Sequence, residues 1–152
     1  MKKALSLIVL ATVLCAGPAF AADPIVGTWK LNVAKSKFAE GKALTAGTRV
    51  YTEVNGVYTL DIKQVGADGK EASSRPQYRN GKEEKQTSDY VDTLLAKKIN
   101  ENTWDFDLKK NGKVVGRVHR VVSADGKTLT VHNTGTLVGY VAGDETLVYD
   151  KQ

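Results

Sequence analysis

The sequence predicts an all-β protein whose antiparallel strands follow one another as an up-and-down meander and close into a barrel. Asn-Gly or Asp-Gly pairs, which form tight hairpin turns, begin at residues 55, 68, 80, 111 and 125. Runs rich in Val, Thr, Tyr, Leu and Ile lie between these pairs, and none has a helical pattern. A meander of about eight to ten strands has two exposed edges unless it closes, which favours a barrel.

A removable leader precedes the predicted barrel. It has a positive start (Met1-Lys2-Lys3), an apolar stretch too short for a normal membrane span, and the small-x-small cleavage pattern Ala19-Phe20-Ala21. We therefore expect a signal peptide at 1–21 and one β-barrel domain at 22–152. Cys15 belongs to the apolar stretch, because the residue before it is not small, as a lipoprotein site requires.

The remaining 131 residues are enough for one domain with a substantial core. Losing Lys2 and Lys3 lowers the net charge from +5 to +3, and the other basic residues are scattered, which argues against a nucleic-acid partner. The processed chain has no cysteine, so it folds without disulfides. No membrane span is expected after cleavage. The Lys-Lys leader without a further sorting motif favours the periplasm over full secretion.

The predicted strands are separated by turn pairs and by two longer connections. Ser36 to Ala46 carries Phe38 and Leu44, and it is either a lid over the barrel mouth or an ordinary surface loop. Lys82 to Asp89 is strongly polar and is expected to be solvated. The predicted strands are 26–34, 47–54, 57–65, 71–79, 91–99, 103–110, 113–122, 127–133 and 145–150.

Alternation within two of these strands identifies an inner face. One strand directs Trp104, Phe106 and Leu108 inward, and the other directs Tyr58, Leu60 and Ile62 inward. A three-residue loop with a bulge at Gly56 would add Val50 and Thr52 to this face. These residues form the predicted lining of the barrel.

The register of the strand "KVVGRVHRVV" decides which arginine is inside. A two-residue loop at Asn111-Gly112 turns Arg117 and His119 inward, whereas a three-residue loop turns Val118 and Arg120 inward. We favour the second arrangement because it buries three valines and one arginine. Arg120 then either binds the acidic group of a ligand or stacks on Trp29 to close the barrel end, and the structural role is preferred.

The two histidines are expected to face each other on neighbouring strands. A two-residue loop at Asp125-Gly126 places His119 opposite His132. Zinc sites usually have three or four protein ligands, and no third ligand is evident. If both loops have two residues, Asp105 and Asp107 point to the opposite face, so no metal site is predicted.

The segments "GTWKLNVAKSKF" and "KKNGKVVGRVHRVVSADGKTLTV" resemble those of lipocalin-like barrels of the calycin superfamily. More closely, they are similar to a group of small exported bacterial lipocalin-like proteins of unassigned function. The resemblance implies that Gly27 and Trp29 open the first strand. It also implies that Trp29 packs at the closed end, often beneath an Arg or Lys from a late strand.

Two related kinds of barrel differ from this sequence in their binding residues. Avidin-like barrels also begin with Gly-Thr-Trp, but several tryptophans line their pocket and this chain has only Trp29 and Trp104. Fatty-acid-binding barrels hold a carboxylate with Arg-x-Tyr near the end of the chain. Here the final strand has Tyr149 without an arginine two residues earlier.

No catalytic motif is present, so the chain is not expected to be an enzyme. It lacks G-x-S-x-G, H-E-x-x-H, a processed-chain cysteine and a glycine-rich phosphate loop, and no cofactor is predicted. Alternation places Asp105 and Asp107 on a solvated face rather than in an acid/base pair.

Three functions follow from these observations. The first is a carrier or sensor that holds a small, mainly apolar or amphipathic molecule. The second is a filled barrel that acts through its surface, in the envelope or on protein partners. The third, an enzyme, rests only on His119 and Arg117. The first is preferred, and its predicted ligand-binding residues are Tyr58, Leu60, Trp104, Phe106, Val118 and Arg120.

Overall fold

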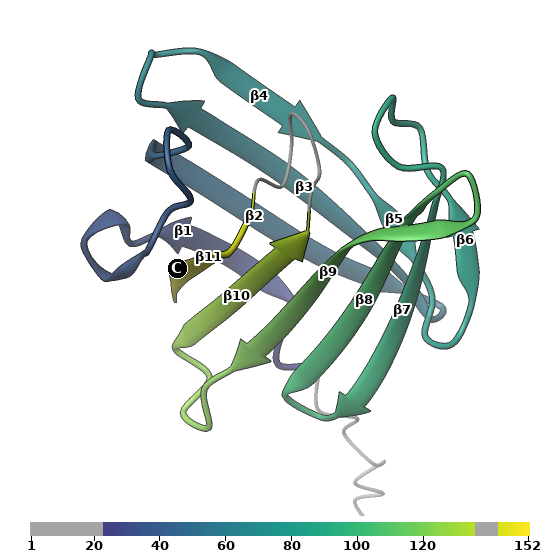
Figure 1. Cartoon of the computed structure of the whole chain (residues 1–152). Coiled ribbons are helices and arrows are strands. Elements are labelled where there is room, and N and C mark those ends of the chain that lie inside the picture. The colour runs from purple at the N-terminus through teal and green to yellow at the C-terminus, as the bar shows by residue number, and fades with distance from the viewer. Residues whose placement is uncertain (1–22, 136–142) are drawn as a thin grey trace, which may run out of the picture.

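The computed structural model describes residues 23–135 and 143–152, which form one antiparallel sheet curled into a half-barrel (Figure 1). The predicted leader at 1–21 lies outside the described residues. No helix within the described part of the chain is long and apolar enough to cross a membrane. The elements are β1 (Gly27–Leu31), the 3-10 helix η1 (Val33–Lys35), β2 (Leu44–Val54), β3 (Val57–Gly66), β4 (Glu71–Ser74), β5 (Gln77–Tyr78), β6 (Glu83–Lys85), β7 (Thr93–Asn100), β8 (Thr103–Lys110), β9 (Lys113–Val122), β10 (Thr128–Gly135) and β11 (Glu145–Lys151).

The sheet order confirms the predicted meander. Neighbouring strands are paired in the order β4-β3-β2-β1-β11-β10-β9-β8-β7-β6, so the first and last strands of the chain lie side by side. In Figure 1, β2 and β3 pass behind the group β7 to β10, and the inner faces of the two groups enclose the core. The two ends of the sheet are brought together by an isolated bridge between Asn80 and Ala96 and by β5, which pairs with β3.

Three segments differ from the prediction. The predicted strand 26–34 is shorter, because β1 ends at Leu31 and the 3-10 helix η1 follows it. The segment 71–79 is divided into β4 and β5 around Pro76, because proline has no N–H to donate to a strand ladder. The polar segment Lys82 to Asp89 contains β6, which was not predicted. Its Glu83 pairs with Leu95 of β7 and accepts a hydrogen bond from Lys109 Nζ at 2.5 Å. Charged side chains therefore cover an edge strand that the hydrophobic pattern does not reveal.

The turn at Asn55-Gly56 corrects the predicted inner face of β2. Val54 pairs directly with Val57, and Asn55 and Gly56 have φ angles of 52° and 77°, as in a two-residue hairpin turn. A three-residue loop is therefore not formed, and Val50 and Thr52 do not join the inner face. Their alternating neighbours Arg49 and Tyr51 are buried there instead.

The turn at Asn111-Gly112 also has two residues, but a bulge restores the favoured register. Lys110 pairs with Lys113, yet Leu108 pairs with Gly116, which leaves Val115 as an extra residue on β9. Beyond this bulge, Phe106 lies opposite Val118 and Trp104 opposite Arg120. The predicted inward position of Arg120 is confirmed, although the predicted loop length is wrong.

The bulged part of β9 lies against a glycine that tolerates no side chain. Gly135 has a φ of +122°, and a Cβ atom there would lie 2.4 Å from the Val115 carbonyl oxygen and 2.6 Å from Gly116 Cα. We expect Gly135→Ala to lower the free energy of unfolding by about 3 kcal/mol through backbone strain and overpacking. Urea denaturation measures this loss.

Gly56→Ala is the matched control for this prediction. Gly56 also has a positive φ, of +77°, but a Cβ atom there meets nothing within 4 Å. Its cost should be only about 1 kcal/mol, the cost of the conformation alone. Equal losses in the two variants would contradict the close packing of Gly135 on β9.

Candidate ligand-binding interior

The six residues predicted to bind a ligand all lie on the inner face of the barrel. None is more than 9 % exposed, and the strand registers place Phe106 beside Val118 and Trp104 beside Arg120. Their inward orientation is confirmed by these positions. Contact with a ligand stays a prediction. The six are Tyr58, Leu60, Trp104, Phe106, Val118 and Arg120.

Four buried aromatic side chains pack against one another in one part of the interior. Tyr58 stacks on Tyr78 with ring centroids 5.2 Å apart, and Trp104 meets Tyr58 edge-on at 4.9 Å. Phe106 meets Tyr78 edge-on at 5.0 Å. Such edge-on and offset arrangements are the favoured geometries of aromatic pairs. These rings therefore pack on one another and occupy part of the interior.

A partly buried ion pair connects Asp23, the first described residue, to this aromatic cluster. Asp23 Oδ2 accepts hydrogen bonds from Tyr58 Oη at 2.8 Å and from Lys98 Nζ at 2.6 Å. Burial, together with the hydrogen bond to Asp23, raises the pKa of Tyr58, so the hydroxyl keeps its proton and donates. Only 7 % of the Asp23 side chain is exposed. Its two charge-assisted hydrogen bonds connect the start of the described chain to β3 and β7.

Trp29 packs at the same closed end, as the resemblance implied. It is fully buried, and its Nε1 donates to the Ile25 carbonyl oxygen at 2.8 Å. Gly27, two residues before it, has a φ of +130° and lies against the Lys151 side chain. The cation over the Trp29 ring is Lys151 Nζ, 5.0 Å from the ring centroid. Lys151 of the final strand therefore has the stacking role that was preferred for Arg120.

Arg120 lies instead over the rings of the aromatic cluster. Its Cζ is 3.9 Å from the centroid of Phe106, 5.6 Å from that of Tyr51 and 5.9 Å from that of Tyr78. Among residues 23–135 and 143–152, its Nε and Nη1 find no hydrogen-bond partner, although both atoms are buried. Desolvated N–H groups of a charged side chain are costly without an acceptor. Arg120 is thus a buried cation with unused donors.

Arg49 is a second buried arginine, which the sequence analysis missed. It is 5 % exposed, its Cζ lies 5.0 Å from the centroid of the Tyr149 ring, and its Nη1 donates to Tyr51 Oη at 3.5 Å. Burial opposes its charge, but the neighbouring Tyr149 and Tyr51 raise the pKa of Arg49, so it stays protonated. The two-residue turn at Asn55-Gly56, which sets the register of β2, was the signal that would have revealed it.

Glu145, at the start of β11, is a carboxylate that interacts with the charge of Arg49. Glu145 is 8 % exposed, and its Oε1 accepts a hydrogen bond from Asn133 Nδ2 at 2.8 Å. It lines a cavity of about 430 Å³ together with Leu44 and Gln64. This volume is within the usual range for small-molecule sites. The cavity lies between β2, β3, β4 and β11, and it defines the mouth of the barrel.

The connection Ser36 to Ala46 borders this mouth. Phe38 and Leu44 are half-buried and pack against the core, as a covering segment requires. The backbone N–H of Lys37 donates to the Thr146 carbonyl oxygen at 2.7 Å, which fixes the connection to β11. Leu44 already belongs to β2, so the connection is shorter than the sequence suggested.

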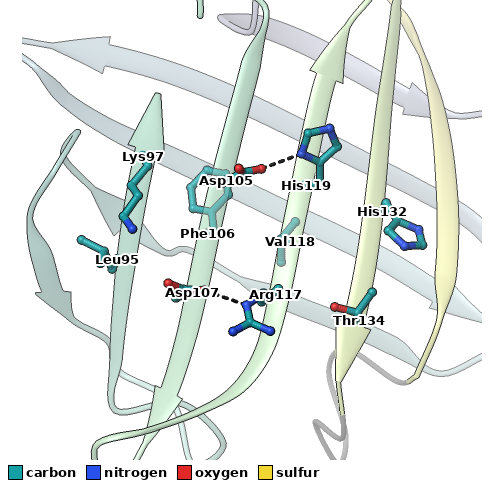
Figure 2. A pocket seen from close by; sticks show the side chains of 10 residues that line it. All are labelled: Leu95, Lys97, Asp105, Phe106, Asp107, Arg117, Val118, His119, His132 and Thr134. Atoms are coloured by element: carbon teal, nitrogen blue, oxygen red, sulfur yellow. Dashed lines mark hydrogen bonds and ion pairs between the residues drawn. The ribbon is translucent and has the colours of Figure 1, made fainter. Parts of the chain in front are cut away.

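A second depression, of about 330 Å³, lies on the outer face of β7 to β10 (Figure 2). His119 is there, and its Nδ1 lies 2.5 Å from Asp105 Oδ1, while Arg117 Nε donates to Asp107 Oδ1 at 3.2 Å. The predicted solvated face of the two aspartates is confirmed. The opposite-face position that two two-residue loops would give them does not occur, because the bulge on β9 brings Asp105 beside His119.

The predicted pairing of the two histidines is confirmed. His119 lies directly opposite His132, although residues 124 to 127 form the connecting loop, and both side chains are about half exposed. Among residues 23–135 and 143–152, no three His, Cys, Asp or Glu side chains are grouped to hold a metal ion. The outer depression therefore offers polar and charged groups, in contrast to the apolar interior.

Comparison with known proteins finds the same fold in several solved structures. The fluorescent protein UnaG matches with a TM-score of 0.62 over 87 % of this chain and 100 % of its own, at 16 % identity. A fatty acid binding protein of Schistosoma mansoni, solved with arachidonic acid, matches with a TM-score of 0.57 over 85 % of this chain and 96 % of its own, at 18 % identity. Apo lipid binding protein 8 of Caenorhabditis elegans matches with a TM-score of 0.60 over 87 % and 98 %, at 8 % identity.

These matches identify the fold. This chain has the same β-barrel fold as these three proteins. No protein-family model matches the sequence, and no curated protein is significantly similar to it. At these identities the likeness is one of fold alone, and the residues of the interior have to be interpreted on their own chemistry.

Proposed function

We propose that this protein is a carrier or sensor that binds one small, mainly apolar molecule with an acidic group inside its barrel. The observation that carries the proposal is the Arg120 guanidinium, which is buried among aromatic rings with two N–H groups lacking acceptors in the described part of the chain. A carboxylate or similar anion supplies both the acceptors and the missing negative charge. The ligand enters through the mouth cavity and directs its acidic group inward.

The charges of the interior support an anionic ligand. The described inner face carries two arginines, Arg49 and Arg120, and Glu145 near the first of them. One positive charge is therefore left without a counter-charge. Neighbours of the same fold include a fatty acid binding protein in complex with arachidonic acid. Arachidonic acid has an apolar chain and a carboxylate, like the proposed ligand. The likeness in fold supports an apolar interior site. The buried charge of Arg120 supports an acidic group on the ligand.

A matched pair of fluorescent dyes tests the proposal. 1-Anilinonaphthalene-8-sulfonate is an anion, and N-phenyl-1-naphthylamine has the same rings without the sulfonate. We expect saturable binding of the sulfonate, one molecule per chain, and weaker binding of the neutral dye. Equal affinities would contradict the acidic-group assignment.

The packed rings favour a second function, a filled barrel that works through its surface. The ring centroids of Tyr58, Tyr78, Trp104 and Phe106 are 4.9 to 6.1 Å apart in the contacting pairs. These side chains therefore already occupy part of the barrel interior. Absence of saturable binding of either dye would favour this second function.

Export and a binding rather than catalytic role are also part of the proposal. The leader at 1–21 supports delivery to the periplasm, and a processed chain beginning at Ala22 in a periplasmic fraction is the expected result of N-terminal sequencing. The enzymatic hypothesis rested on His119 and Arg117, whose side chains are on the outer face.

A further inference from the structure

Glu145 is a buried carboxylate at the mouth through which the proposed ligand enters. Its side chain accepts the Asn133 hydrogen bond at 2.8 Å and lines the cavity of about 430 Å³. Only 8 % of the residue is exposed. A carboxylate in this position interacts with any other charge inside the barrel through a medium of low dielectric constant.

The charged groups around Glu145 come from three parts of the chain. Arg49 of β2 attracts it from within the barrel. Lys42 lines the cavity from the connection before β2, and Asp68 and Lys70 line it from the β3–β4 turn. Asp68 and Lys70 form an ion pair at 3.0 Å, so together they are close to neutral. Asn133 of β10 and Gln64 of β3 are uncharged, which leaves Arg49 as the buried partner charge.

We infer that Glu145 sets the charge of the ligand that the interior accepts, so that binding of an anion is coupled to uptake of a proton by Glu145. This inference rests on the proposed function. While Glu145 is ionised, it offsets Arg49, and the interior has room for the single negative charge that Arg120 neutralises. When Glu145 is protonated, both arginines attract the anion. A bound anion in turn makes the proton on Glu145 more favourable, because linkage is reciprocal.

The environment of Glu145 favours its protonated form. Burial raises the pKa of Glu145 above its ordinary value, although the Asn133 hydrogen bond, the Arg49 charge and the Ala39 N–H each oppose the increase. Protonation therefore begins at a higher pH than for an exposed glutamate. As the pH falls, a growing fraction of the protein therefore has a neutral Glu145.

Binding of the two dyes between pH 8 and pH 5 tests the inference, because the sulfonate of 1-anilinonaphthalene-8-sulfonate stays ionised throughout. In the native protein its affinity should rise as the pH falls, by at most about tenfold, the effect of removing one like charge from an interior with an effective dielectric constant near 20. Glu145→Gln should bind it about tenfold more tightly at pH 8 and should show little dependence on pH. The neutral dye should be insensitive to pH in both proteins.

Two controls separate this result from other titrations and from loss of folding. Histidines ordinarily titrate near pH 6.5, so His119→Asn/His132→Asn, altered only on the outer face, should keep the native pH profile. Calorimetry of sulfonate binding to the native protein in two buffers of different ionisation enthalpy should show net proton uptake, whatever the folding of the variants.

If the native protein binds the sulfonate dye but its affinity does not change with pH, the inference is overturned and the proposed function stands. A slope that persists in folded Glu145→Gln would also overturn it. Failure of both dyes to bind the native protein would overturn the proposed function and the inference with it.

Discussion

Trp29→Ala is expected to lower the free energy of unfolding by about 4 kcal/mol, as is typical for truncating a large buried aromatic side chain. Trp29 has no exposed surface, and the Lys151 ammonium lies 5.0 Å from its ring centroid. Alanine leaves a void at the closed end and removes the donor that satisfies the Ile25 carbonyl oxygen. Urea denaturation followed by circular dichroism measures the loss.

Phenylalanine at the two tryptophan positions provides a sharper comparison. Trp29→Phe removes the 2.8 Å hydrogen bond to Ile25, whereas Trp104 Nε1 has no partner in the described residues. Trp29→Phe should therefore be about 1–2 kcal/mol more destabilising than Trp104→Phe, the cost of a buried carbonyl left without its donor. Equal losses would contradict the assigned role of the Trp29 indole N–H.

Arg120→Met is expected to weaken binding of 1-anilinonaphthalene-8-sulfonate at least tenfold without lowering the free energy of unfolding. Arg120 is 5 % exposed and has unused donors, so the folded state bears the cost of an uncompensated charge. Methionine fills a similar volume and removes that cost, which should raise the free energy of unfolding by about 1–3 kcal/mol. Affinity for the neutral dye should be unchanged.

Arg117→Met is the matched control on the same strand. Arg117 points outward, its side chain is 70 % exposed, and its contact is the ion pair with Asp107 at 3.2 Å. Such surface pairs contribute about 0–1 kcal/mol, so both dye binding and stability should stay close to native. A large loss of stability in Arg120→Met, with dye binding retained, would make Arg120 a structural residue and support the filled barrel.

Hydrophobic alternation and turn residues were sufficient to predict most of the strands. β8 and β9 have the predicted bounds, and β3 extends one residue further. The inward faces of β3 and β8 also follow from alternation, because each combines aromatic or branched residues with polar neighbours. β6 was missed since an edge strand of charged residues has no apolar face to detect.

Register was the step at which sequence reasoning failed, because one residue reverses every side chain of a strand. At Asn55-Gly56, only a two-residue loop places Arg49 on the inner face, whereas a three-residue loop would have placed Val50 and Thr52 there. At Asn111-Gly112, an incorrect loop length was offset by the bulge at Val115, and Arg120 came out on the correct face. The mouth cavity beside Glu145 depends on three-dimensional packing that no local pattern records.

The central claim, that the barrel holds a small acidic apolar molecule, is tested most directly by native mass spectrometry of the processed protein purified from its own host. The mass under native conditions is compared with the mass after denaturation. The account predicts a reproducible additional mass, lost on denaturation, that belongs to an apolar molecule with one acidic group. A bare native mass, together with failure to bind the anionic dye, would contradict the claim and establish the filled barrel in its place.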